Sequence, residues 1–319
     1  MRIVFFGSGA FGLPTLRMLH ERHDLVRIVT QPDRRAGRGR QLTPSPVGAF
    51  ADTHRLPTLK PERINEPEIV HAIRDLDADA FVVIAYGQKL GPELLADQFA
   101  INLHSSLLPR HRGAAPIHWA ILSGDEITGV SVITLAPTMD AGDVLGHRTI
   151  TISPEETAGE LHDRLAELGP ELVLDVLNGH ATGTLTPAPQ DESLATHARK
   201  LSRADATVDF ALDAAEVRAR VHGLTPWPGC RVEVGDRSLT LCRVRVVDPE
   251  GDHGAPGTHR EDGSIACGRG LILPLEVHPP GKSVMEYAAY LRGRPIEPGT
   301  RWRAITAEPA SADGGGGHP

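Results

Sequence analysis

The first half of the chain alternates short apolar runs with amphipathic segments of helical period. We expect strands at residues 2–6, 25–30, 80–85, 100–104, 129–135 and 144–152, and helices at 13–21, 66–75, 115–122 and 157–177. Strands that alternate with helices predict an α/β domain with a doubly wound, mostly parallel, Rossmann-like sheet, because parallel strands need crossover connections. In such sheets ligands bind beyond the carboxyl ends of the strands.

The pattern changes after Pro189, and a second domain is expected there. Residues 190–207 are polar and read as a linker, and residues 212–222 read as a helix. Short strands follow at 231–234, 238–247, 264–266 and 271–277, separated by Pro-Gly pairs. We therefore predict an α/β domain over residues 1–189 and a small, OB-like β-barrel over 208–306. The Gly-rich tail, 307–319, is expected to be disordered.

Composition excludes several classes of protein. The formal charge of −8 argues against a protein that coats nucleic acid, although a local basic patch remains possible. The three cysteines, Cys230, Cys242 and Cys267, form no CxxC spacing, so neither a disulfide framework nor a zinc site is indicated. The first apolar run is too short for a signal peptide, and no later run is long enough to span a membrane. We expect a cytoplasmic protein without a membrane partner.

Two polar residues end the apolar run at 100–104. Asn102 and His104 are two positions apart, so on a strand they share a face. An amide donor beside a titratable ring can polarise a carbonyl and stabilise the oxyanion that forms from it. Asp140, in a Gly-containing turn further along, adds a carboxylate that would raise the imidazole pKa. A single histidine at a strand end is as often structural as catalytic, but the three residues together suit attack on an acyl carbon.

The first strand leads into Gly7-Ser8-Gly9-Ala10-Phe11-Gly12, a literal GxGxxG between a strand and a helix. This spacing is the dinucleotide fingerprint, and Asp33 follows the second strand where a ribose-binding acid would stand. The other interpretation is a tight glycine turn, which any doubly wound sheet needs at its first junction. The second interpretation is favoured because a dehydrogenase does not explain Asn102, His104 and Asp140.

The loop 31–46 is too long for an ordinary strand–helix connection and carries four arginines: Arg34, Arg35, Arg38 and Arg40. Guanidinium groups match phosphate oxygens, so the loop is expected to be a mobile arm that grips phosphates. A solvated basic loop is the alternative. Two other basic groups receive structural interpretations: Arg110, His111 and Arg112 as a solvated turn, and Arg243 and Arg245 as one face of a half-buried strand.

Taken together, these motifs resemble the methionyl-tRNA formyltransferases, a branch of the 10-formyltetrahydrofolate-dependent formyltransferases, along nearly the whole chain except the C-terminal tail. The matching segments are QPDRRAGRG (31–39), AYGQKL (85–90), NLHSSLLPRHRGAAPI (102–117), MDAGD (139–143), LHDRLAELGP (161–170) and PWPGC (226–230). The segment with Asn102 and His104, together with MDAGD, is shared by enzymes that use this formyl donor. The arginine loop and the β-rich C-terminal domain select the tRNA enzyme.

The resemblance implies formyl transfer from 10-formyltetrahydrofolate to the free α-amine of methionyl-initiator tRNA, in translation initiation. It implies Asn102, His104 and Asp140 as catalytic residues, with no metal and no nicotinamide cofactor. It assigns folate binding to Ser106, Leu107, Leu108 and Pro109 and to backbone around Tyr86, Gly87, Gln88 and Leu90, the methionyl end to Phe11, and the tRNA acceptor stem to Arg38 with Arg34, Arg35 and Arg40. The C-terminal barrel would bind tRNA, and we expect a monomer.

Three other functions stay open at the level of sequence. The first is an NAD(P)-dependent oxidoreductase, which rests on the glycine turn and Asp33. The second is a tRNA-binding protein without catalysis, which rests on the arginine loop. The third is an enzyme that uses the same formyl donor but formylates another amine.

Overall fold

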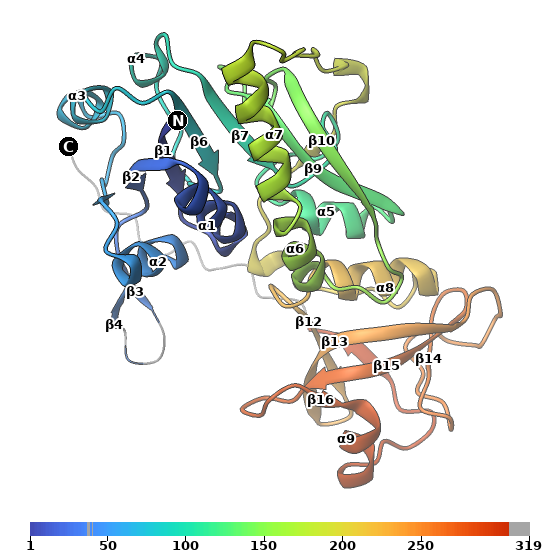
Figure 1. Cartoon of the computed structure of the whole chain (residues 1–319). Helices are drawn as coiled ribbons and strands as arrows, with labels where there is room; N and C mark the ends of the chain where they lie inside the picture. The colour runs from blue at the N-terminus through green and yellow to red at the C-terminus, as the bar shows by residue number, and fades with distance from the viewer. Residues whose placement is uncertain (37–38, 40, 306–319) are drawn as a thin grey trace, which may run out of the picture. The chain divides into compact units, whose positions relative to one another are not determined.

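The computed structural model describes residues 1–36, 39 and 41–305, and it contains two compact units (Figure 1). The first unit comprises Met1–Gly113, Ile127–Thr151 and His162–Ala198. The second comprises Ala114–Glu126, Ile152–Leu161 and the residues from Arg199 on. The contacts thus assign two internal segments to the second unit, while the boundaries expected at 189 and 207 stay predictions. The expected disordered tail lies outside the described residues.

The first unit is built on a seven-stranded sheet with the order β10-β9-β7-β6-β1-β2-β5. Its strands are β1 (Arg2–Gly7), β2 (Asp24–Val29), β5 (Thr58–Leu59), β6 (Ala80–Ile84), β7 (Ala100–His104), β9 (Ile127–Thr134) and β10 (Val144–Thr151). The five strands from β7 to β5 run parallel, whereas β9 and β10 are antiparallel to their neighbours. The predicted doubly wound, mostly parallel sheet is confirmed.

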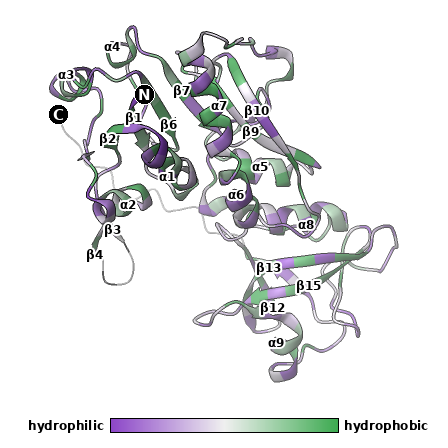
Figure 2. Ribbon diagram, in the orientation of Figure 1, coloured by the Kyte–Doolittle hydropathy of each residue, from purple (hydrophilic) through white to green (hydrophobic). Residues whose placement is uncertain are grey.

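The central strands are buried on both faces, which explains their continuous apolar sequence. All five residues of β6 are buried, and Ile3 to Phe6 of β1 have no exposed surface. One face packs against α3 (Pro67–Arg74) and α4 (Pro92–Leu95) through Ile73 and Leu94. On the sheet's other side, α1 (Leu13–Arg22) packs against α7 (Gly169–Thr182), and α7 contacts β9 and β10 (Figure 1). Figure 2 shows the apolar colour concentrated on these strands.

The single helix expected at 157–177 is two helices, α6 (Ala158–Ala166) and α7. Pro170 stands in the first turn of α7. A proline there supplies no N–H, so the helical hydrogen-bond ladder cannot run through from α6. Gly169 adds a packing reason, because a Cβ at this position would lie 2.6 Å from both Leu103 and Thr15. The sharp start of α7 lets it approach β7 closely.

The second unit contains an antiparallel, barrel-like sheet, which confirms the predicted β-rich C-terminal domain. Its strand order is β14-β15-β13-β12-β17, and β16 pairs with β15. The strands are β12 (Cys230–Val234), β13 (Arg237–Asp248), β14 (Ile265–Ala266), β15 (Leu271–His278), β16 (Met285–Glu286) and β17 (Trp302–Ala304), and the helices of this unit are α5 (Pro116–Leu122), α8 (Ala214–Gly223) and α9 (Tyr287–Gly293). Along β12, buried and exposed residues alternate, as one covered face requires.

Several short elements were not predicted. They are α2 (Pro46–His54), the hairpin of β3 (Arg34–Ala36) and β4 (Gln41–Thr43), and the parallel pair of β8 (Arg112–Gly113) with β11 (His197–Ala198), together with α4, α9, β5, β16 and β17. Three 3₁₀ turns, Ala10–Gly12, Glu192–Leu194 and Arg203–Asp205, complete the structure. Runs of two or three residues are too short to show a hydrophobic period. The polar segment 190–207 is therefore ordered in part by β11, and the arginine loop by its hairpin.

His222 is a buried titratable group in the second unit. Its ring is 1% exposed, and its Nε2 accepts a hydrogen bond of 3.0 Å from the backbone N–H of Val244. Burial, followed by the positive charges of Arg218 and Arg243, lowers the pKa of His222 to about 4. The folded state thus holds a neutral ring, whereas the unfolded chain takes up a proton near pH 6.5. Stability from this group is complete above pH 6.5 and is lost as the pH falls toward 4.

We predict that His222→Gln flattens the pH dependence of the second unit's stability. Between pH 7 and pH 5 the wild type should lose roughly 2 kcal/mol more unfolding free energy than the variant, by proton linkage. Trp119, Trp227 and Trp302 all belong to this unit, so urea unfolding followed by tryptophan fluorescence reports on it. His71→Gln is the control, because His71 is 80% exposed. Equal slopes for the wild type and His222→Gln would contradict the linkage.

Candidate active site

β7 places Asn102 and His104 on one face, as their spacing predicts. The strand pairs with β6 on one side and with β9 on the other, where His104 stands opposite Ser131. His104 is the last residue of β7, so it lies at the carboxyl end of the parallel strands, and it is only 6% exposed. A ring so enclosed needs specific partners for its two nitrogens.

Asp140 is the residue that gathers the site. Its Oδ2 accepts a 2.9 Å hydrogen bond from the backbone N–H of Gly113 and lies 3.6 Å from His104 Nδ1. Its Oδ1 lies 3.5 Å from Asn102 Nδ2. The Asp140 side chain is 12% exposed, and the backbone has a φ of +54°, which most residues avoid. The structure therefore brings together the three side chains that the sequence singled out.

The environment of His104 sets two effects against each other. Its Nε2 lies 3.0 Å from the backbone carbonyl oxygen of His111, so both ring nitrogens face an acceptor oxygen. Burial lowers the pKa of His104, while Asp140 and the His111 carbonyl raise it, and burial prevails. The sequence predicted that Asp140 would raise the pKa of the ring. Asp140 acts in that direction, but the desolvation of the imidazolium outweighs it.

A second layer of residues holds the Asp140 turn, and the sequence did not predict it. Gln190 donates from Nε2 to the backbone carbonyls of Asp140 (2.8 Å) and Gly142 (2.7 Å). Arg112, in turn, donates to Gln190 Oε1 and to the carboxylate of Glu192 at 2.7 to 3.0 Å. Arg112 is 5% exposed, so the expected solvated turn is wrong at this residue. Its sequence signal was weak, because its partners lie in the segment that reads as a linker.

The segment after β7 is held by serine hydroxyls. Ser106 is fully buried, and its hydroxyl donates to the carbonyl of Arg110 at 2.6 Å. Ser131 Oγ donates to the Ser106 carbonyl (2.8 Å) and accepts from the Leu108 N–H (3.2 Å). The side chain of Ser106 is thus occupied within the loop, whereas Leu107, Leu108 and Pro109 are partly exposed.

The segment 86–90 combines buried side chains, an exposed glycine and the exposed Lys89. Tyr86 and Leu90 are buried in the core of the first unit. Gln88 accepts from the Ile64 N–H (2.8 Å) and donates to the Pro61 carbonyl (3.2 Å), which fixes the segment on its neighbour. Gly87, with a φ of +91°, is exposed. The expectation that backbone in this segment meets the ligand stays a prediction.

The first glycine turn is explained by close packing. A Cβ on Gly7 would lie 2.5 Å from the Phe5 ring and 2.9 Å from the Ile84 carbonyl oxygen. Phe11 is 6% exposed and meets the His162 ring edge-on at 5.4 Å. The site prediction placed Phe11 at the methionyl end, and the structure leaves only a small part of its ring accessible.

The carboxylate of Asp33 is already engaged. It accepts a 2.8 Å hydrogen bond from Lys60 Nζ, and both side chains are 27% exposed. A ribose-binding acid would have to give up that ion pair. Nearby, Arg34 forms an exposed ion pair of 3.2 Å with Glu62, and Arg35 lies in β3. Arg38 and Arg40 lie outside the described residues.

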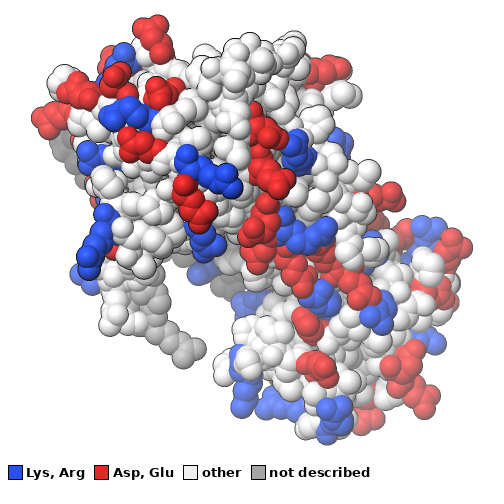
Figure 3. All heavy atoms as spheres, viewed as in Figure 1, with Lys and Arg blue, Asp and Glu red and all other residues white. Residues whose placement is uncertain are grey.

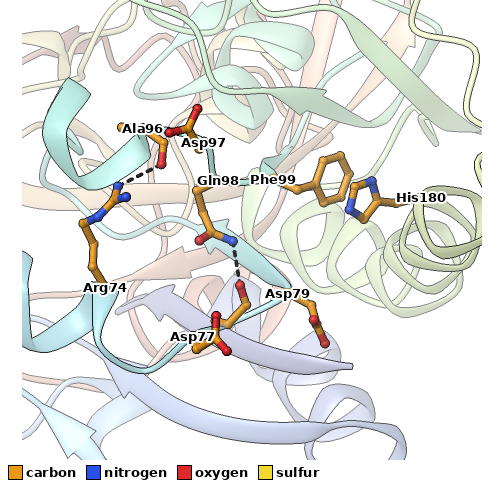
Figure 4. A pocket seen from close by; sticks show the side chains of 9 residues that line it. Arg74, Asp77, Asp79, Ala96, Asp97, Gln98, Phe99 and His180 are labelled. Carbon is orange, nitrogen blue, oxygen red and sulfur yellow. Dashed lines mark hydrogen bonds between the residues drawn. The ribbon is translucent and has the colours of Figure 1, made fainter.

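A separate cavity of about 360 Å³ lies at the opposite ends of the strands (Figure 4). Its lining includes Arg74, Asp77, Asp79, Gln98, Phe99 and His180. Gln98 donates to the Ala78 carbonyl (2.9 Å), and the Phe99 ring stacks on His180 with centroids 3.6 Å apart. Asp77 and Asp79 precede β6, and Gln98 and Phe99 precede β7, whereas Asn102 and His104 lie toward the carboxyl ends. The cavity and the Asp140 cluster therefore lie at opposite ends of the parallel strands.

Two family models match the chain. The formyl transferase model matches residues 1–177, and the model of the formyl transferase C-terminal domain matches residues 200–295. The chain is 41% identical over 309 residues to a protein of Geobacter sulfurreducens named methionyl-tRNA formyltransferase, covering 94% of this chain and 96% of that one. A protein of the same name from Symbiobacterium thermophilum is 40% identical over 325 residues, covering 98% and 99%.

Solved structures share the fold at low sequence identity. HypX from Aquifex aeolicus, in complex with tetrahydrofolic acid, superposes with a TM-score of 0.60 at 20% identity, over 91% of this chain and 47% of that one. An N-formyltransferase from Helicobacter canadensis, in complex with folinic acid and dTDP-3-aminofucose, superposes with a TM-score of 0.64 at 13% identity, over 85% and 98%.

We predict that Asp140→Asn lowers the pKa of His104 further, because it removes the negative charge that opposes burial. The measurement is an NMR titration of the His104 ring, assigned by comparison with His104→Gln. Asp143→Asn is the matched control, since Asp143 is exposed in the same turn. A His104 pKa that stays constant or rises in Asp140→Asn would show that Asp140 does not act on the ring by charge.

Proposed function

The chain belongs to the methionyl-tRNA formyltransferase family, and from that membership we propose that it transfers a formyl group from 10-formyltetrahydrofolate to the α-amine of methionyl-initiator tRNA. The observation that carries this function is the 41% identity over 94% of the chain. The Asn102, His104 and Asp140 cluster supplies the groups that acyl transfer requires.

Asn102 is proposed to bind the oxygen of the formyl group. An amide NH₂ carries two N–H bonds, and the contact with Asp140 Oδ1 uses one of them. That contact fixes the plane of the amide, so the second N–H is oriented before substrate arrives. When the amine attacks the formyl carbon, the carbonyl oxygen becomes an oxyanion, and a fixed donor stabilises it. A neutral amine needs no covalent enzyme intermediate.

His104 and Asp140 are proposed to hold the proton that the reaction moves. The new C–N bond forms on the α-amine, which must lose a proton, and the bond from carbon to N10 breaks, so N10 must gain one. A buried ring with a lowered pKa is neutral at pH 7 and can accept a proton, and Asp140, 3.6 Å away, stabilises the imidazolium. A neutral resting ring therefore suits the role better than a permanently charged one.

The folate is proposed to lie along the exposed backbone at Gly87 and along Leu107, Leu108 and Pro109, close to the end of β7. The expected contribution of Ser106 would come from its backbone, because its hydroxyl is bound to Arg110. No group of three metal-ligating side chains occurs in the described part of the chain. The related HypX structure holds tetrahydrofolic acid, which supports a folate donor.

The tRNA acceptor stem is proposed to meet the arginine loop, through Arg38 with Arg34, Arg35 and Arg40. Figure 3 shows basic and acidic side chains interspersed on the face in view, so this loop is the basic feature to test first. No helix within residues 1–36 and 41–305 is long and apolar enough to cross a bilayer. The monomeric state stays a prediction.

The function is tested by incubation with 10-formyltetrahydrofolate and charged initiator tRNA, with formyl incorporation as the measurement. We predict that Asn102→Ala and His104→Ala each lower kcat by roughly 10²-fold, the scale for one oxyanion donor or acid–base group. Ser105→Ala, in the same segment, is the control. Turnover close to that of the wild type in either variant would remove that residue from the mechanism.

We predict that Arg38→Ala lowers kcat/KM for charged initiator tRNA more than for elongator tRNA, and leaves the KM for folate unchanged. A side chain that reads the end of the acceptor stem affects discrimination, whereas a phosphate contact weakens all tRNAs alike and fades with salt. The measurement is kcat/KM for both tRNAs at two salt concentrations. Equal losses would reduce Arg38 to a phosphate contact.

A further inference from the structure

Three hydroxyl groups form a hydrogen-bonded chain at the base of the arginine loop. Thr30 directly precedes the loop, and Ser45 lies near its end as the N-cap of α2. Their hydroxyl oxygens are 2.6 Å apart. Thr30 Oγ1 lies 3.4 Å from Ser8 Oγ, in the first glycine turn, and Ser8 Oγ donates to the Tyr86 carbonyl at 3.1 Å. We call Ser45, Thr30 and Ser8 the hydroxyl chain.

The hydrogen bonds of the hydroxyl chain run in one consistent direction. Ser45 Oγ accepts from the Gly48 N–H at 2.9 Å, so its own proton is free to point at Thr30. Thr30 then donates to Ser8, and Ser8 donates to the Tyr86 carbonyl. Thr30 has no exposed surface, so its hydroxyl needs these partners. The hydroxyl chain thus joins both ends of the loop to the backbone of segment 86–90.

Gln31, the first residue of the loop, is tied to the same groups. Its backbone N–H donates to Ser8 Oγ at 3.0 Å, and its side-chain amide donates to the Tyr86 carbonyl at 3.2 Å. The direction in which the polypeptide leaves β2 is therefore set by side chains of other segments.

Lys60 makes a second connection between the two ends of the loop. Its ammonium binds Asp33, inside the loop, at 2.8 Å, and lies 3.6 Å from Asp52 of α2, which follows the loop. The Lys60 stem also passes over α2, where a Cβ on Gly48 would lie 3.6 Å from Lys60 Cε. Two independent contacts, one between hydroxyls and one ionic, therefore hold the same two flanks together.

We propose that the hydroxyl chain and Lys60 position the arginine loop for the acceptor tRNA, which makes Thr30, Ser45, Ser8 and Lys60 positioning residues of RNA recognition. The proposal rests on the proposed function. A long loop with Gly and Pro loses entropy when it binds, and a closed base reduces the number of conformations it must give up. Residues that do not touch RNA would then set its affinity.

The experiment compares Thr30→Val with Thr30→Ser and with Thr53→Val. Valine matches threonine in shape and lacks the hydroxyl, and serine restores it. Thr53 is the matched control, because it is an exposed threonine of α2 whose hydroxyl bonds the Ala49 carbonyl at 2.8 Å. In Thr30→Val we expect the KM for charged initiator tRNA to rise roughly 5- to 10-fold, the scale of one hydrogen bond. The kcat and the folate KM should stay within about twofold.

Lys60→Met is the second variant, and we expect it to raise the KM for tRNA in the same way. It keeps the proposal testable if Thr30→Val does not fold. Hydrogen exchange of the backbone amides in 33–35 and 41–43, measured without substrates, should be faster in both variants and unchanged in Thr53→Val. An unchanged KM for tRNA in the folded variants, or parallel losses in kcat and folate KM, would overturn the proposal. A wild type that forms no formylmethionyl-tRNA would instead overturn the proposed function, and the exchange measurement separates the two outcomes.

Discussion

The site depends on the carboxylate of Asp140, which is nearly buried and has a polar partner at each of its two oxygens. Asp140 accepts from the Gly113 N–H and faces Asn102 and His104, while its own backbone carbonyl is bound by Gln190. Burying a carboxylate costs free energy unless hydrogen-bond donors surround it. The donors around Asp140 therefore stabilise the turn, and the turn keeps the carboxylate in position. Glycine is needed beside it, since a Cβ on Gly142 would lie 1.8 Å from the Thr134 carbonyl oxygen. The positive φ of Asp140 is sustained by these contacts.

The same arrangement explains why a ring with a lowered pKa still suits the reaction. Burial keeps His104 neutral, and acceptor oxygens of Asp140 and His111 lie beside its two ring nitrogens. In the proposed mechanism the ring is a base whose surroundings already suit its charged form. Little reorganisation is needed when the proton arrives, and preorganised charge of this kind is where enzymes gain most of their rate. Arg112, behind Gln190, extends the support without touching the reacting groups.

The sequence predicted what depends on local periodicity and failed where contacts are distant. The alternation along β7 placed Asn102 and His104 on one face, and the longer strands of both units were predicted at nearly their observed positions. The helix expected at 157–177 was wrong, because helical period alone does not show that Pro170 starts a second helix. Arg112 was misjudged because its partners, Gln190 and Glu192, are far away in the sequence. A pKa that burial lowers, as at His104, is also invisible before the fold is known.

The first glycine turn shows that the glycine pattern of a dinucleotide site can also be required by packing alone. In this chain the small residues are required by contacts inside the protein, since Gly7 lies against Phe5 and Ile84 and has no room for a side chain. The acid that a dinucleotide site would use, Asp33, is bound by Lys60. Ser8, between the two glycines, donates its hydroxyl to the Tyr86 carbonyl and accepts from the Gln31 N–H. The topological position that carries a nucleotide in other doubly wound sheets is thus filled here by the anchors of a long loop. A glycine fingerprint therefore reports close packing at the first strand–helix junction, and only the polar residues around it determine the ligand.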